Sequence, residues 1–230
     1  AVRSSSMLED SQYQPLAGTY ETFMLPNNEK TTRKRLDSLI TAIKRIFAST
    51  FKGEAKSLLE NTAHRIEEEK MAIIIQEIVG QPFESGRFYP TFSGVLKNVN
   101  FYPVSYMERE EGVAYLALGF GRTIVDGEKC LRISPKYPSI LPQFYSIKTT
   151  RMNSQIQFYG LDLNSTQKKG NDLQDYSLQN AEDDSSLKWV GSVISKDDNT
   201  LRDTLSKPGT RIVSFSPILK WSAIPLTEIL

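Results

Sequence analysis

The clearest periodic pattern in the chain lies between Thr31 and Phe47, where apolar residues recur at three- and four-residue spacing. This spacing predicts one amphipathic helix of about five turns. Its apolar positions are Leu36, Leu39, Ile40, Ile43, Ile46 and Phe47. Pro26 and the two asparagines that follow it form a turn signal, which predicts the start of the helix.

The opposite face of this helix is basic. Its cations are Arg33, Lys34, Arg35, Lys44 and Arg45. Such a row could bind phosphate or nucleic acid, but surfaces for single-stranded nucleic acid interleave cations with aromatic side chains, and this face has no such platform. An ordinary solvated helix face is therefore the favoured interpretation.

Other segments show the short apolar runs or the alternation that are typical of strands. Residues 71–75 are five apolar residues in a row, which predicts a buried strand that ends before Gly80. Residues 113–118 alternate between two faces and lead into Gly119-Phe120-Gly121. Further strands are expected at 155–163, 188–194 and 211–215, and a helix is expected to begin at 225–230.

Between two of these strands, residues 164–186 are rich in Asp, Asn, Gln and Ser. Few apolar side chains are available there to form a core, so this composition predicts a long, mobile surface connection.

Composition places the chain among ordinary globular proteins. It has 230 residues, of which 39% are hydrophobic and 24% are charged, and its formal net charge is +1. That charge gives no electrostatic argument for a nucleic-acid partner, so any anion site must be built locally from a few cations. No apolar run approaches the roughly 18 residues that span a bilayer, which argues against a membrane partner.

The single cysteine and the first residues of the chain indicate the cellular compartment of the protein. The single Cys130 rules out an internal disulfide framework and fits a reducing cytoplasm. Its place in an alternating segment favours a core or half-buried position over a reactive thiol. The first residues carry no secretory signal. Because the sequence begins without Met inside an apparent strand, we expect it to be an excerpt of a longer protein.

The first 25 residues carry the most distinctive chemistry. An apolar start delivers Arg3, and three serines at 4–6 follow it. After Glu9 and Asp10, a turn at Pro15 and Gly18 leads to more small donors at 19–22. Arginine can grip an oxyanion through two nitrogens, and a loop of hydroxyl and backbone N–H groups can surround it. The segment can therefore bind phosphate, although an ordinary polar loop has a similar composition.

The arrangement of these residues closely resembles the ATP-binding domain of the phosphoenolpyruvate synthase and pyruvate phosphate dikinase family. That family typically reads AVRSS, then an acidic pair, then a Gly followed by ETF. The matching positions are Ala1, Val2, Arg3, Ser4, Ser5, Glu9, Asp10, Ala17, Gly18, Glu21, Thr22 and Phe23. Thr19 and Tyr20 depart mildly from it, since Gln-Gln or a similar pair usually stands there.

Two later motifs follow the family in the same order. Gln76 and Val79 match a strand ending that, in ATP-grasp folds, presents backbone amide groups to the adenine edge. Gly119, Gly121 and Gly127, with the apolar pair at 124–125, match the family pattern G-L-G-E-x-V-V-x-G. Together the resemblance implies ATP-binding residues at Ser4, Ser5, Gly18, Thr19, Glu21, Thr22, Gln76, Glu77, Ile78, Val79, Gly119, Gly121 and Arg122.

Two arginines mark the catalytic chemistry that the resemblance implies. Arg3 would hold the transferring phosphates, and Arg132, before Ser134 and Pro135, resembles an Arg-Thr-Pro step and would be a second cation near the triphosphate. Arg122 departs from the family, because many relatives carry a Glu there that would suit magnesium. No metal ligand is assigned from the sequence.

The resemblance implies an α+β fold of the ATP-grasp type, with a mostly antiparallel sheet and helices on one face. We expect residues 1–136 to form a partial ATP-grasp domain. Residues 137–230 are expected to form a β-rich accessory region that returns to the ATP-grasp domain near 211–230.

The function implied is phosphotransfer with ATP and Mg²⁺ as cofactors. By resemblance, the longer chain would phosphorylate a histidine in a separate domain and then pass the phosphoryl group to pyruvate. The only histidine here, His64, lacks the Gly-rich setting of that domain, so it is not expected to be the phosphorylated histidine. The resemblance also implies a lysine-bearing lobe before residue 1 and further strands after residue 230, so this fragment alone is expected to show weak or no catalysis. Two alternatives stay open: a non-catalytic nucleotide-binding regulatory module, and a related dikinase that acts on a glucan.

Overall fold

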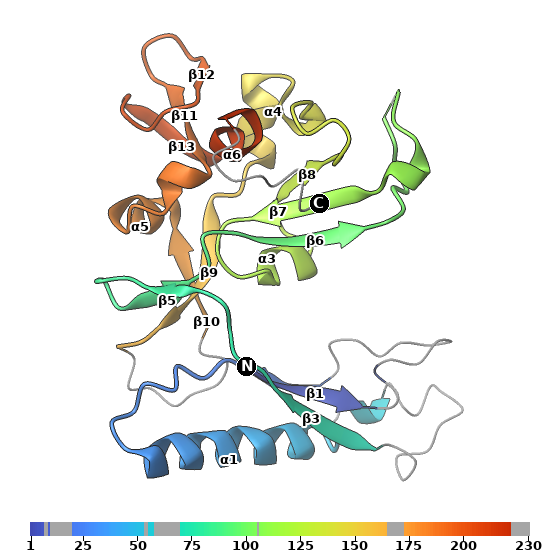
Figure 1. Ribbon diagram of the computed structural model, residues 1–230, viewed down its shortest axis with the longest axis vertical. Coiled ribbons are helices and arrows are strands. Elements are labelled where there is room, and N and C mark those ends of the chain that lie inside the picture. Colours follow the sequence, from blue (N-terminus) through green and yellow to red (C-terminus); the bar gives the residue numbers. More distant parts are fainter. Residues whose placement is uncertain are drawn as a thin grey trace. The chain divides into compact units, whose positions relative to one another are not determined.

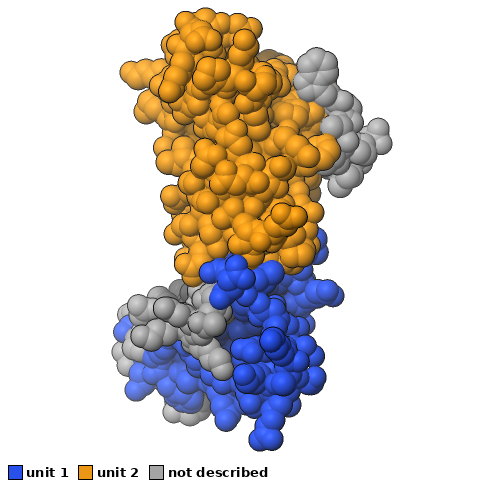
Figure 2. Space-filling model, turned by 90° about the vertical axis from the view of Figure 1, so that its left-hand side faces the viewer, with its two compact units in different colours: residues 1–79, 161–173 blue, residues 80–160, 174–230 orange. Residues whose placement is uncertain are grey.

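The computed structural model describes residues 1–6, 9, 20–52, 55–57, 70–104, 106–164 and 173–221 (Figure 1). The chain divides into two units, which are coloured separately in Figure 2. Unit 1 comprises residues 1–79 and 161–173, and unit 2 comprises residues 80–160 and 174–230. The His64 segment and the helix expected at 225–230 lie outside the described residues.

Unit 1 is built on one small antiparallel sheet. Its strands are β1 (Val2–Ser6), β2 (Thr22–Phe23) and β3 (Met71–Ile75), in the order β2-β1-β3. Helix α1 (Thr32–Ser49) runs along one face of this sheet (Figure 1). The buried side chains between them are Val2, Phe23, Ala42 and Ile46, so the core lies on one side of the sheet only.

The predicted helix is confirmed as α1, but it begins later than the turn signal predicted, and Leu36, Ile40 and Phe47 of its predicted apolar face are exposed. Its N-cap is Thr31, whose hydroxyl accepts a hydrogen bond from the Lys34 N–H at 3.4 Å. Asn27 instead adopts a positive φ of 53° in the connection before the helix. A threonine oxygen at the cap satisfies one of the free N–H groups of the first turn, which explains this starting point.

Strand β3 was correctly predicted as a strand but wrongly predicted to be buried. Ile74 and Ile75 are 38% and 59% exposed. In the described sheet β3 is an edge strand that α1 covers on one face only. An apolar run alone does not distinguish such a strand from a fully buried one.

Unit 2 contains two further three-stranded antiparallel sheets. One joins β6 (Ser93–Lys97), β7 (Val113–Ala117) and β8 (Leu131–Ile133) in chain order. The other has the order β12-β11-β13, with β11 (Gly191–Ser195), β12 (Leu201–Arg202) and β13 (Gly209–Val213). The strands predicted at 113–118 and 211–215 are thereby confirmed, whereas 188–194 begins as a short 3-10 helix, η4 (Leu187–Trp189).

A fourth sheet has the order β10-β9-β5-β4. Its strands are β4 (Gln81–Pro82), β5 (Arg87–Tyr89), β9 (Gln157–Asp162) and β10 (Leu173–Ser177). Strand β9 confirms the segment predicted at 155–163. The remaining helices are short: η2 (Arg109–Glu111), α3 (Arg122–Val125), η3 (Pro142–Phe144), α4 (Ile147–Asn153), α5 (Leu178–Asp183) and α6 (Ser216–Trp221).

The polar stretch 164–186 was wrongly predicted to be one long mobile connection. Its second half contains β10 and α5, and Leu178 and Ala181 of α5 are buried. The Asp184 carboxylate accepts bonds from Arg87 Nε at 2.7 Å and from the Tyr89 hydroxyl at 2.8 Å. These long-range contacts fix the structure of a segment whose polar composition alone predicted no ordered structure.

The ion pair between Arg87 and Asp184 is the most enclosed one among the described residues, with side chains 15% and 4% exposed. Burial alone would raise the pKa of Asp184, but hydrogen bonds from Arg87, Tyr89 and Ser85 outweigh it and lower that pKa. Burial is also the main reason why the pKa of Tyr89 is raised.

The α+β class with antiparallel sheets is confirmed. The described strands form four sheets of three or four strands rather than one. The boundary expected at residue 136 and the accessory role of 137–230 stay predictions.

Candidate functional site

Arg3 lies on the open face of the sheet in unit 1. Along β1 the side chains alternate, so Val2, Ser4 and Ser6 are buried whereas Arg3 is exposed. Its Cα partners are Thr22 on β2 and Ile74 on β3. Because paired residues of antiparallel strands project to the same face, these three side chains form a row on the face opposite α1.

The guanidinium of Arg3 has no hydrogen-bond, ion-pair or aromatic partner among the described residues. Ser5 lies on the same open face and is partly exposed, whereas Ser4 is 3% exposed and projects toward α1. Of the two serines predicted to bind ATP, the structure therefore brings only Ser5 to the face of Arg3. An exposed arginine without a carboxylate partner keeps its full charge available to an anion.

Glu21 projects its carboxylate toward cations at the end of α1. It forms an ion pair with Lys52 and a longer contact of 3.8 Å with Arg45 Nε. Its backbone N–H donates to the Ser49 hydroxyl at 3.4 Å. These contacts fix the start of β2, and thus the position of Thr22 beside Arg3. Gly18 and Thr19 lie outside the described residues.

The segment predicted to hold adenine follows β3 and belongs to no helix or strand. The Ala1 amino group donates to the Gln76 carbonyl at 2.7 Å, and the Gln76 N–H donates to the Ala1 carbonyl at 2.9 Å. Beyond this pair, residues 77–79 form no backbone hydrogen bond to any part of the chain that the structure describes. The side chain of Val79 is 83% exposed. Their N–H and C=O groups can thus pair with a base edge.

Gly119 and Gly121 lie in unit 2, between β7 and α3. Gly119 has a φ of +77°, and a Cβ there would lie 2.7 Å from the Tyr159 carbonyl oxygen. The residue after it, Phe120, donates its N–H to that same oxygen at 3.1 Å. The first glycine of this motif is therefore required by its close approach to β9.

Arg122, the departure from the family pattern, is held by its own unit. Its Nε lies 2.9 Å from a carboxylate oxygen of Asp126, and its guanidinium lies 4.8 Å from the centre of the Tyr159 ring. The bond to Asp126 raises the pKa of Arg122. The Tyr159 hydroxyl donates to Glu128 at 2.7 Å, which raises the pKa of Tyr159 to about 12. The positive charge of Arg122 is therefore already paired with a carboxylate of unit 2.

Arg132 lies on β8 with partners that are all uncharged. Its Nη2 donates to Asn100 Oδ1 at 2.5 Å and to the Tyr102 carbonyl at 2.7 Å, and its backbone N–H donates to Gln143 Oε1 at 2.7 Å. Sequence reasoning missed Asn100 and Gln143, because no local pattern marks an amide that meets an arginine 32 residues away. Cys130, just before β8, is half-buried, and this burial raises the pKa of its thiol.

The described residues bring together no group of three or more His, Cys, Asp or Glu side chains that could hold a metal ion. They therefore offer no ligand set for a magnesium ion held by the protein alone, although Mg²⁺ is often bound by one or two carboxylates together with substrate phosphates. In the same part of the chain, no helix is long and apolar enough to cross a bilayer.

The sequence of the chain matches a known protein family. Residues 1–203 match the family described as pyruvate phosphate dikinase, AMP/ATP-binding domain. The chain belongs to this family, which confirms the resemblance seen in the first 25 residues. It is thus an ATP-binding domain of the class found in phosphotransferases related to pyruvate phosphate dikinase.

One similar protein is the uncharacterized phosphotransferase YvkC of Bacillus subtilis (strain 168). The two are 31% identical over 127 residues, which cover 55% of this chain and 13% of that protein. The chain therefore matches only a small part of the length of that relative. No solved structure matches the chain.

Proposed function

We propose that this chain binds ATP and supplies the nucleotide site of a phosphotransferase with an ATP-grasp fold. The observation that carries the proposal is Arg3, exposed on the open face of β1 and free of any carboxylate among the described residues. The family match over residues 1–203 supports the nucleotide as its ligand.

In this proposal Arg3 binds the phosphates that are transferred. Phosphoryl transfer develops charge on phosphate oxygens, so a fixed cation lowers the barrier by electrostatic stabilisation. Ser5 and Thr22 flank Arg3 with hydroxyl groups, and Gly18 and Thr19 cover the phosphates. Magnesium, when bound with ATP, neutralises further phosphate charge.

Residues 77–79 seat the adenine. An adenine edge needs one donor and one acceptor at fixed separation, and the unpaired backbone groups of this segment supply both. Gly121 and Arg122 of unit 2 stay predicted ATP ligands, and the pairing of Arg122 with Asp126 makes Arg122 a weaker phosphate ligand than Arg3.

For the whole protein, the proposed reaction is also a phosphoryl transfer from ATP. Phosphoryl transfer from ATP to a histidine in a separate domain, and then to pyruvate, is the sequence that we propose in the cytoplasm. A nucleotide-binding regulatory module is the second candidate, and the ion pair at Arg122, where many relatives carry Glu, is the observation that favours it.

The test is ATP binding by the intact protein, measured by isothermal titration with ATP and Mg²⁺. Loss of a charged hydrogen bond to phosphate costs on the order of 2 kcal/mol, so Arg3→Gln should weaken ATP binding by about tenfold or more. Arg33→Gln is the matched control, since Arg33 is an exposed arginine of α1 with the same charge. Equal ATP affinity in the wild type and Arg3→Gln would contradict the assignment.

A second measurement separates the two candidate functions. A phosphotransferase should transfer the phosphoryl group of labelled ATP to its own histidine. Arg3→Gln should lower both the rate of this transfer and the affinity for ATP. A regulatory module should bind ATP without any transfer.

A further inference from the structure

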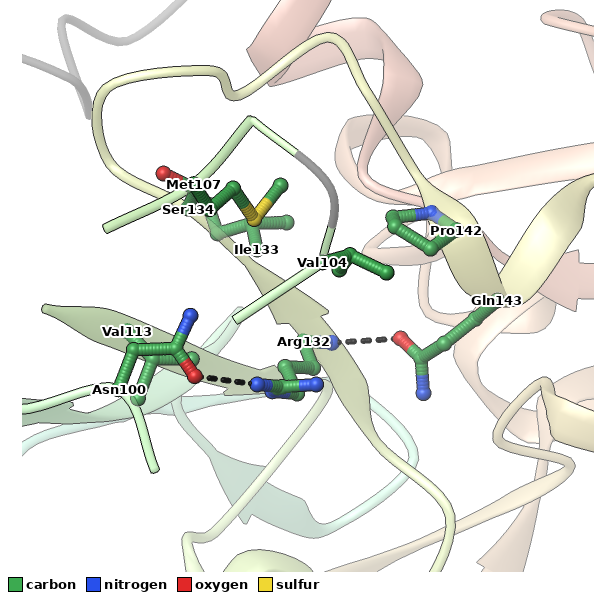
Figure 3. A pocket seen from close by; sticks show the side chains of 9 residues that line it. All are labelled: Asn100, Val104, Met107, Val113, Arg132, Ile133, Ser134, Pro142 and Gln143. Carbon is green, nitrogen blue, oxygen red and sulfur yellow. Dashed lines mark hydrogen bonds between the residues drawn. The ribbon is translucent and has the colours of Figure 1, made fainter. Parts of the chain in front are cut away.

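Unit 2 contains a small pocket around Arg132, the arginine that the resemblance implies as a second cation near the triphosphate. It lies between β8, the 100–107 segment and η3, and Figure 3 shows the side chains that line it. Its polar lining consists of Asn100, Arg132, Ser134 and Gln143, and the remaining walls are apolar. Its cavity volume is about 30 Å³, well below the roughly 300 Å³ at which sites for drug-sized ligands begin, so only a small ligand fits.

Two polar groups in this pocket lack partners. The Oγ of Ser134 and the Nε of Arg132 are both buried, and neither forms a hydrogen bond within the described residues. Ser134 as a whole is only 3% exposed. A buried polar group without a partner is costly to the fold, so a ligand that accepts hydrogen bonds from both groups would recover that loss on binding.

The pocket has the charge of an anion site. Among the described residues that line it none is acidic, so none of them neutralises the positive charge of Arg132. The amide of Asn100 keeps its oxygen on Arg132, which leaves the Asn100 N–H groups as further donors. The nearby Glu111 carboxylate is engaged by Lys136 Nζ at 2.6 Å.

We propose that this pocket binds a small free oxyanion, of the carboxylate or phosphate type, separately from the nucleotide. Ser134 directly follows β8, two positions after Arg132, and both residues line the pocket (Figure 3). An anion held there can accept hydrogen bonds from the donors of this lining. The apolar walls receive the rest of a short carboxylic acid.

Two features argue against a nucleotide phosphate as the occupant. The described residues that line the pocket include no glycine, the residue that lets a backbone approach nucleotide phosphates closely. It is also too small for a triphosphate chain. The inference goes beyond the proposed function, since it requires neither Arg3 nor ATP.

The test is titration of the intact protein with inorganic phosphate and with acetate at constant ionic strength, with and without saturating ATP. We expect saturable binding of at least one probe that ATP does not displace. Arg132→Gln should weaken this binding about tenfold and Ser134→Ala about threefold. Arg151→Gln, which removes an arginine of α4 outside the pocket, should leave it unchanged.

Ser134→Ala keeps the test valid even if Arg132→Gln folds poorly. Its hydroxyl has no partner, so the substitution should leave the unfolding temperature of the ligand-free protein equal or higher while it reduces the stabilisation by phosphate or acetate. Three results would overturn the proposal: no saturable binding of either probe, displacement of the bound probe by ATP, or equal binding by Ser134→Ala and the wild type.

Discussion

Arg3 in unit 1 and Arg87 in unit 2 are both strand arginines, but their guanidinium groups have opposite surroundings. Arg87 is enclosed and bonds both oxygens of the Asp184 carboxylate, at 2.7 and 2.9 Å. Arg3 is exposed on an open sheet face and has no partner among the described residues. The ion pair of Arg87 stabilises the fold, whereas the charge of Arg3 is available to a ligand.

This contrast separates structural from binding arginines without any knowledge of the ligand. Arg211 pairs with Glu182 at 2.7 Å in a partly buried pair, so it resembles Arg87, whereas the pair of Arg122 with Asp126 at 2.9 Å is exposed. Arg132 is intermediate, because it is anchored by neutral oxygens and retains its charge. Substitutions of arginines that are paired with a buried carboxylate should alter stability, and substitutions of Arg3 should alter ligand binding.

The largest expected effect on stability comes from Asp184→Ala. It leaves the enclosed Arg87 charge and the buried Tyr89 hydroxyl without their main partner, and removal of one member of a buried ion pair costs about 4 kcal/mol. Urea denaturation of the intact protein measures the loss. Asp198→Ala, which breaks an exposed pair with Arg202, should cost far less. Equal losses would contradict the structural role of Arg87.

Gly119→Ala should be the next most harmful change. A side chain at a positive φ costs about 1–3 kcal/mol, and here the new Cβ would also meet the Tyr159 carbonyl at 2.7 Å. Gly127→Ala is the matched control, because Gly127 has a φ of +73° but nothing within 4 Å of its Cβ position. The difference in unfolding free energy between the two variants isolates the close approach to β9. Equal unfolding free energies of the two variants would show that the backbone at Gly119 can move away from β9.

Acid should remove the stabilisation by Asp184. The pKa of this carboxyl is lowered in the fold below its usual value of 3.8, so its contribution is present above pH 3.8 and is lost as the pH falls through the folded pKa. The difference in unfolding free energy between the wild type and Asp184→Asn should therefore be constant near neutral pH and shrink below about pH 4. A difference that stays constant down to pH 2 would contradict the ion pair.

Glu21→Gln should have the smallest effect on stability. Its main partner, Lys52, is 57% exposed, and exposed ion pairs contribute less than about 1 kcal/mol. A double-mutant cycle with Lys52→Met measures this coupling directly. If Glu21 only positions Thr22 beside Arg3, ATP affinity should fall much less in Glu21→Gln than in Arg3→Gln. A loss as large as that of Arg3→Gln would instead place Glu21 in direct contact with ATP.

Local patterns in the sequence predicted the elements that depend on local structure. The spacing of apolar residues predicted α1, alternation predicted β7, and the arginine-serine motif predicted the strand that carries Arg3. The burial of β3 could not be predicted in this way, because it depends on which strands and helices cover it. The apolar run at 71–75 fits either a central or an edge strand.

The contacts that could not be predicted join residues far apart in the chain. Arg87 and Asp184 are 97 residues apart, and Asp184 lies in a polar stretch that resembled a mobile connection. The pocket around Arg132 depends in the same way on Asn100 and Gln143, whose types are common on any surface. Such partners become visible only when the sheet has brought them together.

The most direct test of the account compares the affinities of ATP and adenosine for the wild type and for Arg3→Gln. If Arg3 binds phosphate on an open sheet face, the wild type should prefer ATP strongly, and Arg3→Gln should reduce that preference about tenfold or more while adenosine affinity stays the same. Arg211→Gln should retain the full preference even if it is less stable. An unchanged preference for ATP in Arg3→Gln would contradict the account.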